Sequence, residues 1–447
     1  MKLTGLLFAA ALLGACTQPA AEENYTRHVD PKIGTGGHGH VFVGANVPFG
    51  LVQVGPTSIP QTWDWCSGYH ASDSTVIGFS HTHLSGTGIG DLFDVTVMPV
   101  TGDVTYARGE EADPASGLWS YADRTQEIAR PGYYSVPLTR YGIRAELTAT
   151  ARVGLHRYTF PASDAAAVVF DLENGGCWDK ATETHLAKEG DRTVTGWRHS
   201  TGWAKDQRVY FAAEFSKPFE KFETIGDNYA RASFRTTDGE QVSLKVALSP
   251  VSIEGAKANL AAELPGWDFD ATAAAADKAW NDELSKVKIE TEDETSKRIF
   301  YTALYHTMVA PSLFCDVNGD YRGADGKVHE NLGRDTYTTF SLWDTYRAAM
   351  PLMTVLHPER MPDIIQTMLH IADEQGRLPV WHLWGNETDC MVGNPGIVAV
   401  ADAIVKGIGG FDREKAFETI RKTAMNPDRG NGLRLSLIHI SEPTRRS

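Results

Sequence analysis

Apolar and polar residues alternate in short runs through the first half of the chain. Residues 94–98, 144–150 and 166–170 form such runs, with turn residues between them at short intervals. A period of two with frequent turns is typical of antiparallel strands in a β-sandwich. In residues 144–150 the alternation predicts a strand with one buried face and one solvent-exposed face. We assign residues 25–264 to an N-terminal antiparallel β-sandwich.

The pattern changes near residue 265. An alanine-rich stretch at residues 271–287 predicts a helix, and we assign residues 265–290 to a linker helix. The residues Thr-Glu-Asp-Glu at 291–294 are typical of a capping box that starts the next helix. We assign residues 291–434 to a helical domain. Its further predicted helices cover residues 343–356, 362–374, 396–408 and 413–424.

The first residues have the pattern of an export signal. Lys2 precedes an apolar run at residues 6–13, and small residues precede Cys16. A run this short indicates a cleaved signal peptide and is too short for a membrane-spanning helix. The residues before Cys16 resemble a bacterial lipobox. We expect residues 1–16 to be a lipoprotein signal peptide, residues 17–24 a linker, and Cys16 the site of lipidation. The alternative is a plain signal peptide with an incidental cysteine.

Charge and cysteine content narrow the partners. The 447 residues include 42 Lys and Arg against 57 Asp and Glu, a formal net charge of −15. We expect no nucleic-acid partner, because phosphate binding needs a basic surface. The five cysteines are scattered and form no CxxC pair, which argues against a disulfide framework and a cysteine-rich zinc site. We expect an exported protein, lipid-anchored in the periplasm, at the outer membrane or at the cell surface, which touches the membrane only through Cys16.

The last residues differ in character from the rest of the chain. Residues 435–447 closely resemble the translation of a sequencing adapter. We expect them to be an artefact, and we expect the natural protein to continue past about Arg434. The alternative is a genuine basic tail.

Two motifs have a structural interpretation that competes with a functional one. Residues 34–39 satisfy G-x-G-x-x-G, but residues 41–44 read as strand and turn, whereas a dinucleotide site needs a helix there. We interpret these glycines as a loop that closely approaches a ligand or another strand. The pairs His38/His40 and His81/His83 have the i, i+2 spacing with which a strand could chelate a metal. Hydrogen-bonded structural histidines are the favoured alternative.

Tryptophan and carboxylate residues occur together at three places: residues 63–66 (Trp-Asp-Trp-Cys), the pair Trp343 and Asp344, and residues 379–388, which include Glu387. Aromatic rings can pack against the C–H faces of sugars while carboxylates bind the hydroxyl groups. Glycosidases also need two carboxylic groups, one as acid and one as base. The alternatives are core aromatics, a helix N-cap for Asp344 and a structural ion pair for Glu387.

Taken together, the sequence motifs of this chain resemble those of glycoside hydrolase family 92, the bacterial calcium-dependent exo-acting α-mannosidases. The resemblance runs from about Val29 to Asp428. The strings that carry it, in chain order, are residues 29–37, 66–70, 78–88, 341–347 and 385–388.

The resemblance implies a β-sandwich followed by an (α/α)6 barrel, with the sugar pocket where they meet. It implies hydrolysis of terminal α-mannosides of glycans with inversion, by one carboxylic acid and one carboxylate that activates water. It also implies a Ca²⁺ ion that holds mannose hydroxyls. Twelve helices of about 12 residues with loops of about 5 need on the order of 200 residues. Residues 291–434 are fewer, so we expect an incomplete barrel.

The resemblance also implies a set of substrate-binding residues. Trp343 and Asp344 match positions that hold the terminal mannose, and the region of Trp63 and Trp65 matches loops that contact the leaving sugar. The predicted set is completed by three further residues of the matching strings: Gly37, Cys66 and Glu387, whose role is unassigned.

The family's general acid, its base and its main calcium ligands belong to later motifs that do not occur before Arg434. We therefore assign no catalytic residue and no metal ligand, and expect this chain to be inactive by itself. Two alternatives are a non-catalytic carbohydrate-binding lipoprotein and a different glycosidase or phosphorylase of the same architecture.

Overall fold

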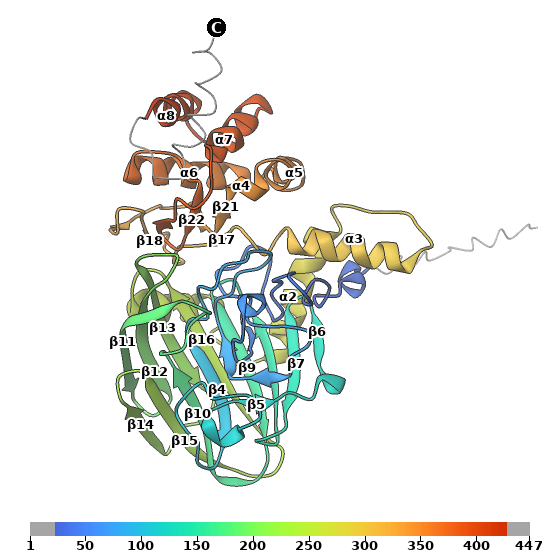
Figure 1. Ribbon diagram of the computed structural model, residues 1–447, viewed down its shortest axis with the longest axis vertical. Helices are drawn as coiled ribbons and strands as arrows, with labels where there is room; N and C mark the ends of the chain where they lie inside the picture. The colour runs from blue at the N-terminus through green and yellow to red at the C-terminus, as the bar shows by residue number, and fades with distance from the viewer. Residues whose placement is uncertain (1–22, 427–447) are drawn as a thin grey trace, which may run out of the picture.

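The computed structural model describes residues 23–426. The predicted signal peptide with Cys16, most of the predicted linker and residues 435–447 lie outside this range. Two antiparallel sheets form the N-terminal half (Figure 1). In spatial order, the eight-stranded sheet contains β11 (Lys180–Glu189), β12 (Thr193–Thr201), β13 (Gln207–Phe215), β16 (Glu240–Ser249), β9 (Val153–Phe160), β8 (Ile143–Ala149), β7 (Tyr133–Leu138) and β6 (Ile128–Arg130). The six-stranded sheet contains β1 (Gly55–Thr57), β3 (Gly78–Ser80), β4 (Thr96–Thr101), β10 (Ser163–Asp171), β15 (Tyr229–Thr236) and β14 (Lys221–Ile225).

The core of the sandwich is built from alternate residues of facing strands. Phe170 on β10 stacks on Phe211 of β13 with ring centroids 6.0 Å apart. Phe160 on β9 meets Phe234 of β15 edge to face at 5.5 Å. All four rings are buried, because every second side chain of a strand points to the same face. The predicted antiparallel sandwich is confirmed.

Short elements connect and cover these sheets. They are η1 (Tyr25–His28), η2 (Trp63–Trp65), β2 (Thr75–Val76), η3 (Pro114–Ser116), β5 (Ser120–Tyr121) and η4 (Arg124–Gln126). The strands β2 and β5 pair with each other in a separate two-stranded sheet.

Helices dominate the chain after β16. They are α1 (Ile253–Glu263), α2 (Phe269–Leu284), α3 (Glu294–His306), α4 (Leu342–Thr345), α5 (Ala349–Leu356), α6 (Met361–Gln375), α7 (Pro395–Val405) and α8 (Arg413–Met425). The predicted order, β first and then α, is confirmed. Figure 1 shows α4 to α8 gathered at one end of the sandwich, with α3 at that same end, while α2 packs against β7, β8 and β9. None of the helices within residues 23–426 is both long and apolar enough to cross a membrane.

The linker region lies against the sandwich. α1, which falls inside the range assigned to the sandwich, packs against β16 and β13 of the larger sheet. α2 occupies the predicted linker helix, and its buried Trp280 donates from Nε1 to the carbonyl of Asn46 at 2.7 Å. This contact fixes the helix to an N-terminal loop of the sandwich. The domain boundaries themselves stay a prediction.

The structure corrects two local predictions. The helix expected at residues 343–356 is broken into α4 and α5, because Pro351 lacks an N–H and its ring would clash with the carbonyl of Arg347. Helix α3 starts from Asp293, whose carboxylate accepts from the N–H of Thr295 at 3.0 Å, and not from a capping box at Thr291.

Short strands also occur in the helical region, where the sequence predicted none. They are β17 (Ser312–Leu313), β18 (Tyr321–Arg322), β19 (Val328–His329), β20 (Tyr337–Thr338), β21 (Phe340–Ser341), β22 (Trp381–Leu383) and β23 (Asn386–Glu387). The strands β21, β22 and β23 form one antiparallel sheet.

Candidate functional site

The loops at one end of the sandwich meet the helical region, and several predicted site residues lie at this junction. Trp63 in η2 is 48% exposed, and its Nε1 donates to the carbonyl of Gly88 at 2.9 Å. The ring is flanked by His40, with centroids 4.1 Å apart. The carboxylate of Asp64 accepts from Nδ1 of His38 at 2.5 Å. The turn therefore presents the exposed indole of Trp63 and is itself held by hydrogen bonds to Gly88 and His38.

The next two residues of this turn point inward. Trp65 is buried, donates from Nε1 to a carboxylate oxygen of Asp73 at 2.7 Å and stacks on His70. Cys66 is buried, and its thiol donates to the carbonyl of Thr87 at 3.4 Å. Burial raises the pKa of the Cys66 thiol to about 12. Both side chains hold the turn in place, and Cys66 ties it to the loop at residues 85–88.

Gly37 lies in the glycine-rich loop that the sequence singled out. Its φ is +57°, and an added Cβ would meet open space. Its carbonyl accepts from Nε2 of His70 at 3.3 Å. The loop is a turn that packs beside the Trp65 region, and no helix begins directly after it, in residues 38–44.

On the helical side, Trp343 and Asp344 occupy α4. The Trp343 side chain is 42% exposed. The Asp344 carboxylate accepts a short hydrogen bond from the hydroxyl of Ser341. Asp344 and the sandwich loop that contains Thr87 line the same cavity, of about 140 Å³. The structure therefore brings Asp344 next to the loop that supports Trp63 and Cys66.

Glu387 lies on β23 and turns its carboxylate onto the backbone of its own hairpin. Its oxygens accept from the N–H groups of Val380 at 2.8 Å, Trp381 at 2.9 Å and Asp389 at 3.1 Å. The expected alternative was an ion pair, and the structure shows backbone donors in its place. Glu387 thus shapes the β22–β23 hairpin, which pairs through β22 with the strand that leads into α4.

One sandwich loop that contributes to this junction was not predicted from the sequence. The loop between β12 and β13 packs Trp203 edge to face on Trp381 at 4.6 Å. Asp206 and Asn386 exchange two hydrogen bonds of 2.9 and 3.1 Å. A signal was present in the chain, since Gly202-Trp203 interrupts a strand pattern, but nothing local indicates its partner.

The histidine pairs do not form a metal site among the described residues. His81 donates from Nδ1 to the carbonyl of Val95 at 2.6 Å, and His83 from Nδ1 to that of Gln53 at 2.8 Å. Burial lowers the pKa of His81 to about 3 and that of His83 to about 4. Both histidines are structural, as the favoured alternative predicted.

One group of three metal-ligand side chains does come together, and it does not fit calcium. Glu283, His357 and Glu359 have ligand atoms within 4.8 Å of one another. The ammonium of Lys286 lies between the carboxylates, 2.7 Å from Glu283 and 2.9 Å from Glu359. Calcium prefers six to eight oxygen ligands. This group offers two carboxylates and an imidazole, and it already surrounds a cation.

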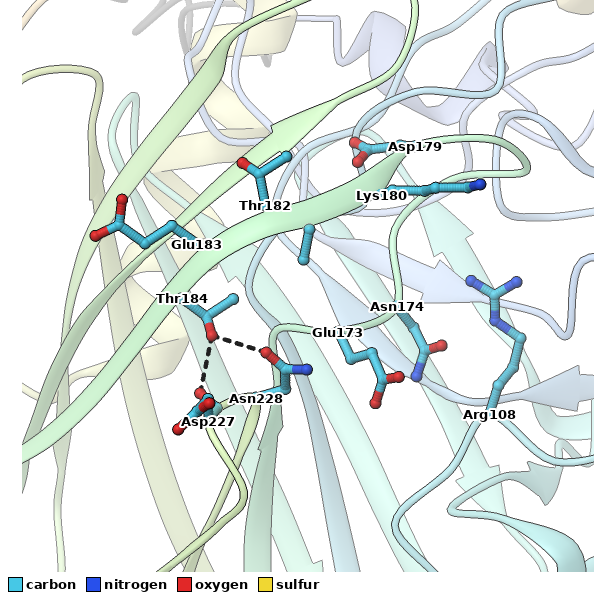
Figure 2. Close-up of a pocket in the computed structure, with 11 residues that line it drawn as sticks. Arg108, Glu173, Asn174, Asp179, Lys180, Thr182, Glu183, Thr184, Asp227 and Asn228 are labelled. Atoms are coloured by element: carbon cyan, nitrogen blue, oxygen red, sulfur yellow. Dashed lines mark hydrogen bonds between the residues drawn. The ribbon is translucent and has the colours of Figure 1, made fainter.

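A larger cavity, of about 760 Å³, opens at the edge of the sandwich (Figure 2). In Figure 2 the Lys180 side chain lies above Glu173 and Asn174, and Arg108 lies beside Asn174. None of the predicted site residues lines it, and neither does any aromatic side chain. The junction beside Asp344 is therefore the candidate site.

Comparison with known proteins is consistent with this assignment. The glycosyl hydrolase family 92 N-terminal domain matches residues 28–249, and the family's catalytic domain matches residues 255–441. A protein of Arthroderma benhamiae described as an uncharacterized secreted glycosidase is 26% identical over 90% of this chain and 52% of its own length.

Two solved structures from Bacteroides thetaiotaomicron are also similar. The family GH92 alpha-mannosidase BT3965 is 38% identical with a TM-score of 0.87, over 91% of this chain and 58% of that one. The family GH92 inverting mannosidase BT2199 is 28% identical with a TM-score of 0.78, over 89% of this chain and 55% of that one. This chain thus spans little more than half the length of the relatives it matches. With both domains matched over most of its length, the chain belongs to glycosyl hydrolase family 92.

Proposed function

We propose that the protein is an exo-acting α-mannosidase that hydrolyses terminal α-mannosides of glycans with inversion. The described residues supply the part of the site that holds the terminal mannose. One observation carries the proposal: the exposed Trp343 and the carboxylate of Asp344 stand together on α4, and Asp344 shares a cavity with the sandwich loop that supports Trp63. A structure of BT3965 in complex with mannoimidazole supports mannose as the sugar.

The chemistry of these side chains suits a sugar. An exposed indole offers an apolar face to C–H groups and an N–H to a hydroxyl. A carboxylate accepts from hydroxyl groups. Trp343 and Asp344 combine both functions on one helical turn, and Trp63 adds a second indole across the junction. We propose that Gly37, Trp65, Cys66 and Glu387 act mainly by holding the backbone around this site.

Hydrolysis with inversion needs two further groups. An acid protonates the leaving oxygen and a base activates water, with the two carboxyls roughly 6.5–9.5 Å apart. We assign neither role to a described residue. The chain by itself is therefore proposed to bind mannosides without cleaving them. Calcium enters no step here, because the group of metal-ligand side chains found among the described residues, Glu283, His357 and Glu359, does not fit it.

Lipidation at Cys16 and export remain part of the proposal. The relative of Arthroderma benhamiae is described as secreted, which supports export. Mass spectrometry of the protein isolated from membranes tests the anchor: a diacylated Cys16 is expected, and an unmodified N-terminal peptide contradicts it.

Titration calorimetry with methyl α-mannoside and methyl α-glucoside tests the function. The full chain should bind the mannoside more tightly, and Asp344→Asn should weaken binding at least tenfold, whereas the exposed control Glu418→Gln should not. Binding that does not distinguish the two sugars, or that ignores Asp344, contradicts the proposal. For any preparation that does cleave, proton NMR of the first product must show the β-anomer of mannose. Cleavage that requires phosphate would identify a phosphorylase instead.

A further inference from the structure

The cavity beside Asp344 contains two polar side chains with unused hydrogen-bonding capacity. Nε2 of His306 and Oγ1 of Thr87 are buried atoms without a hydrogen-bond partner among the described residues. Both residues line the cavity of about 140 Å³ that Asp344 also lines. They come from different parts of the fold, since His306 ends α3 and Thr87 belongs to a sandwich loop.

Unpartnered buried groups of this kind indicate a ligand. A buried donor or acceptor without a partner destabilises the fold, and such groups are rare unless water or a ligand satisfies them. The cavity is far larger than the roughly 10–15 Å³ that one water needs. Its other walls are largely apolar and include Met350, Met353 and Pro311. A group that enters it meets a few polar atoms on an apolar wall, as in typical small-molecule sites.

The protonation state of His306 suits a hydroxyl group. Burial lowers the pKa of His306 to about 4, so the ring is neutral near pH 7. A neutral imidazole has one donor and one acceptor nitrogen, and the Thr87 hydroxyl can act as both. A sugar hydroxyl is likewise donor and acceptor, so it can pair with either group. An anion would find no cationic side chain among the residues that line the cavity.

We propose that His306 and Thr87 are specificity-determining residues that bind a hydroxyl group of the substrate in the cavity beside Asp344. The inference rests on the proposed function and refines it. Thr87 also connects the cavity to the turn of Trp63, because its carbonyl accepts from the Cys66 thiol. A substrate hydroxyl bound here is held from the sandwich and from the helical region at once.

Thr307 provides a matched control. It lines the same cavity, but its hydroxyl already donates to the carbonyl of Leu304 at 2.7 Å. Thr87→Val and Thr307→Val therefore make the same change of side chain in one cavity, once at an unpartnered hydroxyl and once at a partnered one. His306→Gln keeps a polar group, and His306→Leu removes it.

The experiment is titration calorimetry of the full chain with methyl α-mannoside and its 2-, 3-, 4- and 6-deoxy analogues. Thr87→Val and His306→Leu should each weaken mannoside binding about 3- to 10-fold, the effect of one neutral hydrogen bond. Thr307→Val should leave affinity unchanged, and His306→Gln should recover part of the loss. One deoxy analogue should bind the wild type more weakly than methyl α-mannoside does. The same analogue should bind Thr87→Val and the wild type with equal affinity.

The outcomes separate the two proposals. Wild-type chain that binds no mannoside overturns the proposed function and this inference with it. Normal mannoside binding by Thr87→Val and His306→Leu overturns the inference alone. A loss of affinity in the variants that is equal for every deoxy analogue also overturns the inference, because no single substrate hydroxyl then depends on His306 or Thr87 and the cavity holds only water. Thermal unfolding followed by circular dichroism identifies a variant that has lost its fold, and the deoxy series on the wild type still decides whether any single hydroxyl is bound.

Discussion

The Nε2 atoms of His81 and His156 lie 2.9 Å apart between the two sheets of the sandwich. Nδ1 of His81 is 2.6 Å from the carbonyl of Val95, which can only accept, so His81 carries its proton there. His81 Nε2 must then accept from His156 Nε2–H. Nδ1 of His156 in turn accepts from the hydroxyl of Tyr158 at 2.7 Å. Both rings are neutral and each tautomer is fixed by its neighbours.

This pair makes the fold sensitive to acid. Burial lowers the pKa of His81 to about 3 and that of His156 well below its ordinary value. An unfolded histidine titrates near 6.5, so below about pH 6.5 the unfolded chain takes up protons that the folded chain excludes. Stability should then fall by up to about 1.4 kcal/mol per pH unit for each histidine.

Urea unfolding of the wild type and of His156→Gln, between about pH 7.5 and pH 5, measures this slope. The variant should show the shallower slope. Burial raises the pKa values of Asp91 and Asp316 to about 6, which stabilises the fold in acid, but both proteins share that contribution. Equal slopes would show that the histidine pair is not the origin of acid sensitivity.

Gly88 should be required for the position of the Trp63 ring. A Cβ at Gly88 would lie 2.3 Å from Cζ2 of Trp63, so Gly88→Ala must displace the indole. We expect at least a fivefold weaker affinity for mannosides with little change in thermal stability, because Trp63 is half exposed. Gly266→Ala is the control, since a Cβ there meets open space. Calorimetry checks both variants, and equal affinities would remove Trp63 from the site.

Arg198 should be the most sensitive charged residue of the sandwich. Its guanidinium is 2.7 Å from Asp94 and 3.0 Å from Asp179, and all three side chains are buried. Arg198→Met leaves two buried carboxylates without their cation and should cost about 3–5 kcal/mol. By contrast, Arg421 pairs with Glu418 on the solvent-exposed surface, so Arg421→Met should cause no measurable change. Chemical unfolding of both variants checks the contrast, which equal midpoints would refute.

Cysteine reactivity should report the fold around the candidate site. Cys66 is buried and its thiol has a raised pKa of about 12, whereas Cys390 is exposed. The thiolate is the reactive form. Iodoacetamide at about pH 8 should therefore label Cys390 within minutes and Cys66 only in denaturant. Peptide mass spectrometry gives the two rates, and fast labelling of native Cys66 would mean that the turn at residues 63–66 opens.

Glu387 should stabilise the hairpin beside α4. Glu387→Gln replaces one acceptor oxygen by an amide that faces the backbone N–H groups of Val380, Trp381 or Asp389. Leaving such a group unpaired should cost about 1–3 kcal/mol. Hydrogen exchange should increase at those amides first. A variant with native exchange rates would argue that Glu387 acts on the substrate and not on the hairpin.

Local sequence patterns were sufficient for the order of the architecture. Alternation in residues 144–150 and the helical period of residues 362–374 identified β8 and α6 closely, because the buried face of each element is written in its own period. The break between α4 and α5 also has a local cause in the sequence, Pro351. Trp343 and Asp344 were found because an aromatic residue beside a carboxylate is a local signal.

The partners of these residues were decided by the tertiary structure. His81 and His156 are 75 positions apart, and Trp203 meets Trp381 across an even longer separation. The sheet β21–β22–β23 needs residues 340 and 382 to pair, and strands of two or three residues carry no period to detect. His306 and Thr87 are candidate substrate-binding residues because their buried polar atoms lack partners in the folded chain, which no local sequence pattern indicates. A sequence determines which face of each element is apolar, but which polar atoms face each other depends on the packing of distant segments.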